Sequence, residues 1–286
     1  MPDASKFQAL LHLIRFDKPI GTLLLLWPTL WALWIAAGGL PDLDLLLIFT
    51  VGTFLMRSAG CVINDLADRH WDGDVGRTSG RPLVTGAVTA AEARLLFVAL
   101  LAAAFLLVLF TNRLTVMLSV AAVALASTYP FMKRYTHLPQ LVLGAAFSWG
   151  IPMAFAAQLN TLPPALWLIY CANLAWTMAY DTKYAMVDRE DDLVVGIKST
   201  AILFGRHDRL VIALLQVAFI GLLAAAGQAF GLGMLYFAGL VLAALLCVYH
   251  QYLIRDRDPA ACFRAFLHNN WVGATVFVAI ALDYAV

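Results

Sequence analysis

The sequence predicts an all-α polytopic membrane protein, with about nine transmembrane helices around a central cavity. Of its 286 residues, 62% are hydrophobic and only 13% are charged, whereas soluble domains average about 45–50% apolar and about 25% charged residues. Two long stretches, residues 135–180 and 210–254, contain no Asp, Glu, Lys or Arg. This composition excludes an ordinary soluble enzyme and a disordered chain. The net charge of +1 indicates no nucleic-acid partner, and the expected surroundings are a lipid bilayer.

Each predicted span is an apolar stretch of about 20 residues, which is the length of a helix that crosses a bilayer. The two uncharged stretches are each long enough for two spans, joined by turns at residues 160–164 and 231–233. The remaining five spans are predicted at 19–41, 45–63, 95–112, 114–132 and 265–282. Together the nine spans make one transmembrane domain over residues 1–286.

Basic residues mark one face of the membrane. With nine spans, 18 of the 19 lysines and arginines fall on the face that holds the N-terminus, and Arg113 falls on the other. The positive-inside rule predicts that the first face is cytoplasmic. The acidic residues other than Asp42, Asp44 and Asp283 share that face, so we expect a carboxylate-rich site there. The first apolar stretch is too long for a cleavable signal and no transit-peptide composition precedes it, which predicts a bacterial inner (plasma) membrane.

The first acidic cluster follows the second predicted span. On a helix, Asn64, Asp65, Asp68 and Asp72 share one stripe. Asp68 lies four residues after Asn64, three after Asp65 and four before Asp72, and side chains at these spacings lie on one face of a helix. Carboxylates at this spacing repel one another, so a cation that neutralises them would stabilise the stripe. Oxygen ligands suit Mg²⁺, which shares its coordination shell with water and substrate phosphates.

A second acidic cluster follows the sixth predicted span. Asp181 and Asp188 are seven residues apart, and Asp192 follows four residues later, which matches the spacing of the first cluster. The match predicts a weak internal repeat of about four helices. Its two acidic cap loops, at about 64–92 and 181–208, would face each other across the cavity. A solvated loop whose acids merely balance nearby bases explains one such cluster more easily than two.

Basic residues accompany the acids. Those near the two clusters are Arg69, Arg77, Arg81, Lys133, Arg134, Lys183, Arg189 and Lys198. Carboxylates that hold a metal, together with basic side chains, can bind a polyanion such as a diphosphate.

Arg57 lies apart from these residues. It precedes Asn64 by seven residues, which places it on the same stripe but about 10 Å deeper. A charge at the centre of the membrane costs about 2.5–3.5 kcal/mol and marks a functional candidate. We expect an anion receptor for a small carboxylated substrate, with a snorkelling structural arginine as the alternative.

These residues resemble the motifs of the UbiA superfamily of intramembrane aromatic prenyltransferases. The first family motif, NDxxDxxxD, is complete as Asn64, Asp65, Asp68 and Asp72, and the second, DxxxD, is matched by Asp188 and Asp192. Further segments that resemble the family are residues 15–22, 77–83, 129–134 and 196–200. The resemblance covers essentially the whole chain. It implies nine helices, with both motifs at the cytoplasmic end of a central cavity.

The resemblance also implies a reaction. Within the superfamily, the segments around the motifs favour the members that act on 4-hydroxybenzoate. The chain would use Mg²⁺ to transfer a polyprenyl group from polyprenyl diphosphate to the ring carbon ortho to the hydroxyl, releasing diphosphate, in ubiquinone biosynthesis. No motif indicates a protein partner.

The resemblance further implies a role for each group of residues. The metal ligands, directly or through water, would be Asp65, Asp68, Asp72, Asp188 and Asp192. Diphosphate would be bound by Arg77, Lys133, Arg134 and Lys183. Asn64 and Tyr129 would also contact substrate. Arg57 would orient the ring by its carboxylate, and Asp181 or a neighbouring carboxylate such as Asp188 would accept a proton.

Three alternatives stay open from the sequence. Another superfamily member, with homogentisate, dihydroxynaphthoate, haem or chlorophyllide as acceptor, would use the same metal site. A secondary transporter can show similar repeats and intramembrane charges, although its substrate-binding charges lie nearer the midplane. A metal-stabilised structural subunit would show no turnover.

Overall fold

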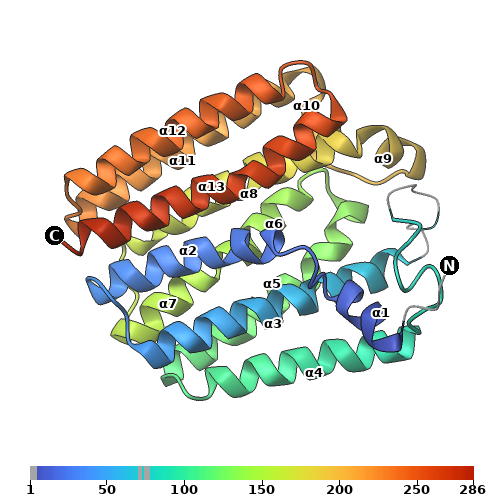
Figure 1. Cartoon of the computed structure of the whole chain (residues 1–286), viewed down its shortest axis with the longest axis horizontal. Coiled ribbons are helices and arrows are strands. Elements are labelled where there is room, and N and C mark those ends of the chain that lie inside the picture. Colours follow the sequence, from blue (N-terminus) through green and yellow to red (C-terminus); the bar gives the residue numbers. More distant parts are fainter. Residues whose placement is uncertain (1–4, 70–72, 74–77) are drawn as a thin grey trace.

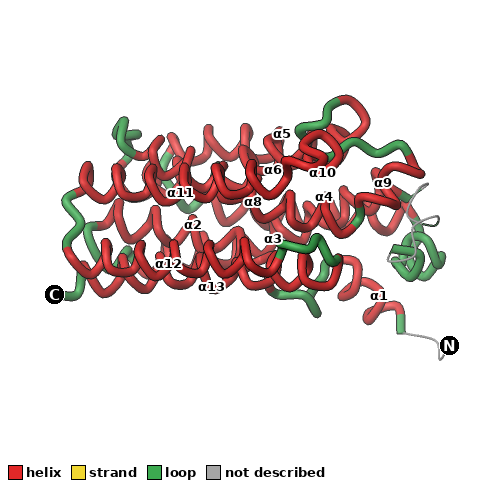
Figure 2. The backbone as a smooth tube through the Cα atoms, turned by 90° about the horizontal axis from the view of Figure 1, so that it is seen from above, coloured by secondary structure: helices red, strands yellow, loops and turns green. Residues whose placement is uncertain are grey.

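A computed structural model describes residues 5–69, 73 and 78–286. Figure 1 shows long helices lying side by side along the longest axis, with the two termini at opposite ends. Over the described residues, only helices and loops are present (Figure 2). This architecture confirms the predicted all-α fold.

The elements follow the predicted spans closely. In chain order they are α1 (Lys6–Leu13), α2 (Ile20–Ala37), α3 (Leu43–Asp68), α4 (Ala90–Val108), α5 (Arg113–Tyr135), α6 (Pro139–Ser148), α7 (Gly150–Leu159), α8 (Leu166–Val187), α9 (Arg189–Val195), α10 (Thr200–Phe204), the short 3₁₀ helix η1 (Gly205–His207), α11 (Asp208–Phe230), α12 (Met234–Leu253) and α13 (Pro259–Asp283). The predicted turns are present: Asn160 caps the end of α7 and Gly231 caps the end of α11, both with the positive φ that closes a helix.

Eight helical segments within the described ranges are long and apolar enough to cross a membrane. One of them joins α6 and α7, and α8 is outside the eight. Polar residues lower the hydropathy of α8, and several of them, including Asn173, Thr177 and Lys183, are fully buried. Since α8 packs against α6, α11 and α13, these side chains face other helices instead of lipid. The predicted count of nine spans therefore stays a prediction, with α8 as the ninth.

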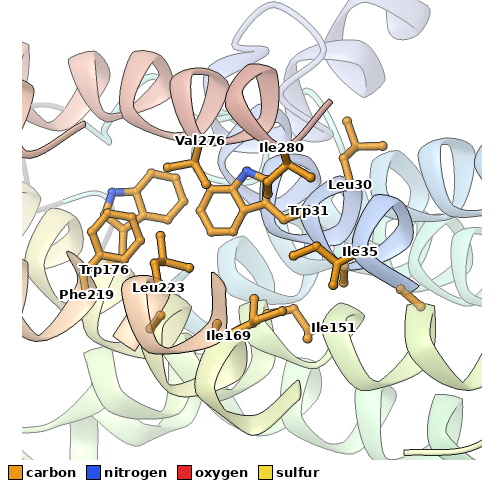
Figure 3. Packing of buried hydrophobic residues seen from close by; sticks show 14 of the residues in the cluster. Leu30, Trp31, Ile35, Ile151, Ile169, Trp176, Phe219, Leu223, Val276 and Ile280 are labelled. Atoms are coloured by element: carbon orange, nitrogen blue, oxygen red, sulfur yellow. The ribbon is translucent and has the colours of Figure 1, made fainter. Parts of the chain in front are cut away.

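The apolar core joins four helices through aromatic side chains (Figure 3). The rings of Trp31 and Trp176 lie 5.5 Å apart, and the ring of Phe219 stacks on Trp176 at 5.6 Å. Both indoles also donate hydrogen bonds to α13, Trp31 to the Gly273 carbonyl at 3.1 Å and Trp176 to Asn269 Oδ1 at 3.2 Å. Buried indoles with satisfied N–H groups fix α2, α8, α11 and α13 relative to one another.

One end of the bundle carries the acidic helix termini, and we call it the acidic end. Here α3 and α8 finish, and α1, α9 and α10 lie beside them (Figure 1). The Lys6 ammonium in α1 lies 2.6 Å from Glu92, which also closes the capping box at the start of α4. This contact ties the first helix of the chain to the bundle.

Candidate functional site

A cavity of about 1060 Å³ extends from the acidic end into the bundle. Its polar lining residues include Arg15, Lys18, Arg57, Asn64, Asp65, Arg81, Tyr129 and Asp181. Its apolar lining residues include Leu101, Phe105, Val108, Phe147 and Met153, from α4, α6 and α7. One continuous space thus has a charged part and a long apolar part.

Asp65 lies at the end of α3 and is almost fully buried, with 1% of its side chain exposed. Arg15 Nη2 donates to both of its carboxylate oxygens, at 2.9 and 2.8 Å. Arg81 Nη1 lies 3.1 Å from Oδ1. Two guanidinium groups therefore neutralise this carboxylate, a task that the sequence assigned to a metal ion.

Asp68, one turn further along α3, is also buried and forms an ion pair with Lys133 through Oδ2. Its other oxygen, Oδ1, is buried and has no hydrogen-bond partner among the described residues. Such an oxygen is costly to bury alone. A buried carboxylate oxygen of this kind suits a hard cation such as Mg²⁺.

The described part of the chain brings no three His, Cys, Asp or Glu side chains close enough to hold a metal ion. Two predicted site residues, Asp72 and Arg77, lie outside the described residues. Asp68 is thus the described carboxylate that best fits a role as a metal ligand.

Asp181 faces the same cavity from α8. The Gln140 side chain lies beside its carboxyl group, and Gln140 Oε1 accepts from the Thr200 N–H at 3.1 Å. Arg57 and Lys133 act electrostatically on Asp181 as well. The carboxylate therefore lies beside an amide and within electrostatic range of two cations.

Asp188 and Asp192 lie further out, at the junction between α8 and α9. Asp188 follows the last residue of α8, and its carbonyl accepts the Asp192 N–H at 2.8 Å. Both residues are half-buried, and neither is among the described lining residues of the cavity. Asp188 still acts electrostatically on Asp181.

The end of α5 connects the two acidic helix termini. The Lys133 ammonium binds Asp68 at the end of α3, while the Lys133 carbonyl accepts the Lys198 N–H at 3.0 Å. The neighbouring Arg134 donates to the Ala67 carbonyl at 2.6 Å. These two of the four predicted diphosphate-binding residues thus lie between the two acidic clusters, outside the described lining of the cavity.

Asp208 holds the second acidic loop in place. Its side chain is fully buried and forms ion pairs with Arg189, which begins α9, and with Arg257, in the turn between α12 and α13. It also accepts the Arg209 N–H at 2.6 Å. The hydrogen bond to Asp208 raises the pKa of the Arg257 guanidinium above its usual value. These bonds join α9 to the start of α11.

Arg57 lines the cavity from α3. Its Nη1 lies 2.7 Å from Cys61 Sγ, and it forms no ion pair with a carboxylate in the described part of the chain. A guanidinium inside a cavity, without a carboxylate partner, is suited to an anionic ligand. Tyr129, another predicted substrate contact, lines the same cavity and lies within electrostatic range of Arg57.

Lys183 is placed differently from the prediction. It is fully buried, its Nζ lies 3.1 Å from His250 Nδ1, and the other nitrogen of His250 lies 3.0 Å from His268 Nδ1. It is not one of the cavity's described lining residues. Two positions along a helix rotate a side chain by about 200°, so Asp181 and Lys183 face opposite sides of α8. The predicted contact of Lys183 with diphosphate does not fit this position.

Two contributors to the site were missed by sequence reasoning. Gln140 is a neutral amide at the start of a stretch selected for its lack of charge, so it gave no signal. Asp208 lies outside both acidic clusters, although the nearby Arg206 and Arg209 mark the segment as polar.

The fold and the site together define a polytopic membrane protein with an amphipathic cavity, in which carboxylates and basic side chains meet at one end. The chain belongs to the UbiA prenyltransferase family, whose model matches residues 25–273.

Curated relatives are similar over nearly the full length of the chain. A 4-hydroxybenzoate octaprenyltransferase of Saccharophagus degradans is 63% identical over 271 residues, which are 95% of this chain and 91% of that protein. A protein of the same name from Aeromonas salmonicida is 63% identical over 276 residues, 96% of each chain. One from Vibrio cholerae is 61% identical over 280 residues, 98% of this chain and 99% of the relative.

Solved structures have the same fold. The apo structure of a UbiA homologue from Aeropyrum pernix K1 superposes with a TM-score of 0.82 at 26% identity, covering 94% of this chain and 98% of that one. A UbiA homologue from Archaeoglobus fulgidus bound to GPP and Mg²⁺ superposes with a TM-score of 0.76 at 19% identity, covering 97% of this chain and all of the other. The second similarity concerns the fold alone.

Proposed function

We propose that the chain transfers a polyprenyl group from polyprenyl diphosphate to 4-hydroxybenzoate, at the ring carbon ortho to the hydroxyl, and so serves ubiquinone biosynthesis. The observation that carries this proposal is the amphipathic cavity, whose charged part suits a diphosphate and whose apolar part suits a polyprenyl chain. Relatives at 59–63% identity that bear the name 4-hydroxybenzoate octaprenyltransferase support it.

In the proposed reaction, the bond between the allylic carbon and the diphosphate oxygen breaks, and its electron pair leaves with the diphosphate. A new carbon–carbon bond forms at the ring, and the ring carbon loses a proton. Mg²⁺, when bound, stabilises the negative charge that develops on the leaving group. Asp68 would hold the ion through Oδ1, with Asp65, Asp72, Asp188 and Asp192 as the further predicted ligands.

The other predicted site residues have roles that follow from their charge. Lys133 and Arg134 would bind diphosphate oxygens, and the predicted Arg77 would do the same. Arg57 would bind the carboxylate of the acceptor and orient its ring, with Asn64 and Tyr129 as further substrate contacts.

The proton has a candidate acceptor in Asp181. This carboxylate faces the cavity, lies beside Gln140 and is within electrostatic range of Arg57. Asp188, which acts on Asp181 from outside the cavity, would adjust its charge state and is the alternative acceptor.

We also propose that residues 1–286 form one domain in the inner membrane of a bacterium, with nine spans and the acidic end in the cytoplasm. The distribution of basic residues supports this orientation. So do the termini at opposite ends of the bundle, since an odd number of spans places them on opposite sides (Figure 1).

The proposed function is tested with purified protein in lipid nanodiscs, Mg²⁺, a polyprenyl diphosphate and ring-labelled 4-hydroxybenzoate. We expect a lipid-soluble labelled product that disappears with EDTA and returns with added Mg²⁺. Homogentisate and dihydroxynaphthoate, offered as competing acceptors, should give little product. A protein that prenylates one of these acceptors in preference would have a different substrate, and a protein with no product at all would not be a prenyltransferase.

A further inference from the structure

The guanidinium of Arg57 lies directly against the backbone of Gly21, the second residue of α2. A Cβ atom built on Gly21 would lie 2.6 Å from Nη2, 2.8 Å from Nε and 3.1 Å from Cζ of Arg57. Carbon and nitrogen atoms that are not bonded do not approach so closely. Any side chain at position 21 would therefore occupy the space that the guanidinium fills.

The backbone at Gly21 does not itself require glycine. Gly21 is helical, and its φ is not positive. Alanine is a better helix former than glycine, so α2 would gain from alanine at this position. The close approach of Arg57 is the feature that favours glycine here.

The guanidinium is held from its other side as well. Nη1 lies 2.7 Å from the sulfur of Cys61, a buried residue one turn further along α3. Gly21, Arg57 and Cys61 all line the cavity. Two helices thus fix the position of the Arg57 guanidinium. Gly21 in α2 leaves room for it, and Cys61 in α3 accepts a hydrogen bond from it.

We propose that Gly21 is a positioning residue, which sets where the Arg57 guanidinium meets the carboxylate of the aromatic acceptor and so helps to select a carboxylated ring. This inference rests on the proposed function, in which Arg57 binds that carboxylate. Because the far end of an arginine is flexible, a methyl group at position 21 moves the guanidinium while the helices stay packed.

The test is Gly21→Ala, measured by steady-state kinetics with each substrate varied in turn. A displaced charge-assisted hydrogen bond predicts a rise of about tenfold in KM for 4-hydroxybenzoate, with KM for polyprenyl diphosphate unchanged. The rate ratio between 4-hydroxybenzoate and phenol, which lacks the carboxylate, should fall by a similar factor. An unchanged acceptor KM, or an equal rise for both substrates, would overturn the inference.

The matched control is Gly221→Ala in α11. A Cβ at Gly221 meets no atom of the described structure within 4 Å, and the residue lies outside the cavity lining. This variant makes the same chemical change in a helix, and both KM values should remain those of the unmodified protein. A rise in acceptor KM as large as that of Gly21→Ala would overturn the inference.

A double variant separates positioning from a general loss of structure. If Gly21 acts through Arg57, then Gly21→Ala adds nothing to the loss of kcat/KM caused by Arg57→Ala, because effects through one contact are not additive. Should Gly21→Ala alone melt at a lower temperature, Gly21→Ala/Arg57→Ala should melt normally, since the clash is gone. Additive losses, or a double variant as unstable as the single one, would overturn the inference. Failure of the unmodified protein to prenylate 4-hydroxybenzoate would instead reject the proposed function.

Discussion

The two acidic helix termini of this protein lie at the same end of the bundle, but they are stabilised in different ways. At the end of α3, Asp65 and Asp68 are buried and bound by Arg15, Arg81 and Lys133. At the end of α8, Asp181 faces the cavity beside a neutral amide.

The difference in their partners indicates different roles for the carboxylates at the two helix termini. Buried ion pairs hold a carboxylate in one position, because both partners are costly to leave unpaired. A carboxylate that faces a cavity, with a neutral partner, keeps the ability to take up a proton or a ligand. Under the proposed function, the α3 terminus would provide fixed charge and the α8 terminus would provide reactive charge.

The largest effect is expected for Asp68→Asn at the fixed terminus. This change removes the charge that binds Lys133 and weakens the oxygen that fits a metal ion. We expect kcat/KM to fall by about a thousandfold, as when a main source of electrostatic stabilisation is lost. Because Lys133 loses its carboxylate partner, we also expect a loss of about 2 kcal/mol of stability, measured by thermal unfolding.

The control for this variant is Asp44→Asn, which removes an exposed carboxylate in the first turn of the same helix. Asp44→Asn should retain full activity. If Asp68→Asn kept full activity, Asp68 would not be a metal ligand, and its ion pair with Lys133 would serve only to stabilise the fold.

The second effect concerns Asp181 at the reactive terminus. Asp181→Asn keeps the shape of the side chain and the possibility of a hydrogen bond to Gln140, but it cannot accept a proton. We expect kcat to fall by about a hundredfold, the usual contribution of a general base, with both KM values retained. A large rise in acceptor KM with unchanged kcat would show that Asp181 binds substrate instead.

A third, smaller effect is expected at Asp208, which holds the loop of the reactive terminus through Arg189 and Arg257. Asp208→Asn leaves two guanidinium groups without their carboxylate. Since both arginines are partly exposed, we expect a loss of about 2 kcal/mol of stability and a fall in activity of about tenfold or less. Thermal unfolding and kinetics on one preparation measure both.

The matched control for Asp208 is Asp256→Asn, because Asp256 is exposed and pairs only locally with Arg255. This variant should change neither stability nor activity. Equal effects at the two positions would mean that the buried ion pairs do not hold the loop.

The fold was predictable because its signal is repeated along the chain. Every predicted span except 45–63, which contains Arg57, is a long stretch without charge, and the turns at Asn160 and Gly231 occur where the sequence places them. Asp65 and Asp181 each follow the end of a predicted span, and both line the same cavity.

The partners within the site were less predictable. A sequence shows that Asp65 is near basic residues, but Arg15 reaches it from a loop 50 positions away. Gln140 carries no charge, so a search for charged residues passes over it. The face of a helix near its end is also ambiguous, because one residue of shift turns a side chain by about 100°.

A substitution of Lys183 tests which face of α8 this residue occupies, and it has the smallest expected effect on activity. It lies two residues after Asp181, yet it is buried against His250, on the side of α8 away from the cavity. Lys183→Met keeps the length and apolar part of the side chain, so we expect activity within about twofold of normal and a loss of about 1–3 kcal/mol for the stranded histidine nitrogen. The comparison is Lys133→Met, which should raise KM for polyprenyl diphosphate, because Lys133 lies at Asp68 between the acidic termini. If the two variants raised the KM for polyprenyl diphosphate equally, Lys183 would bind diphosphate. In that case α8 would not have one face toward the cavity, with Asp181, and an opposite face, with Lys183, packed against other helices.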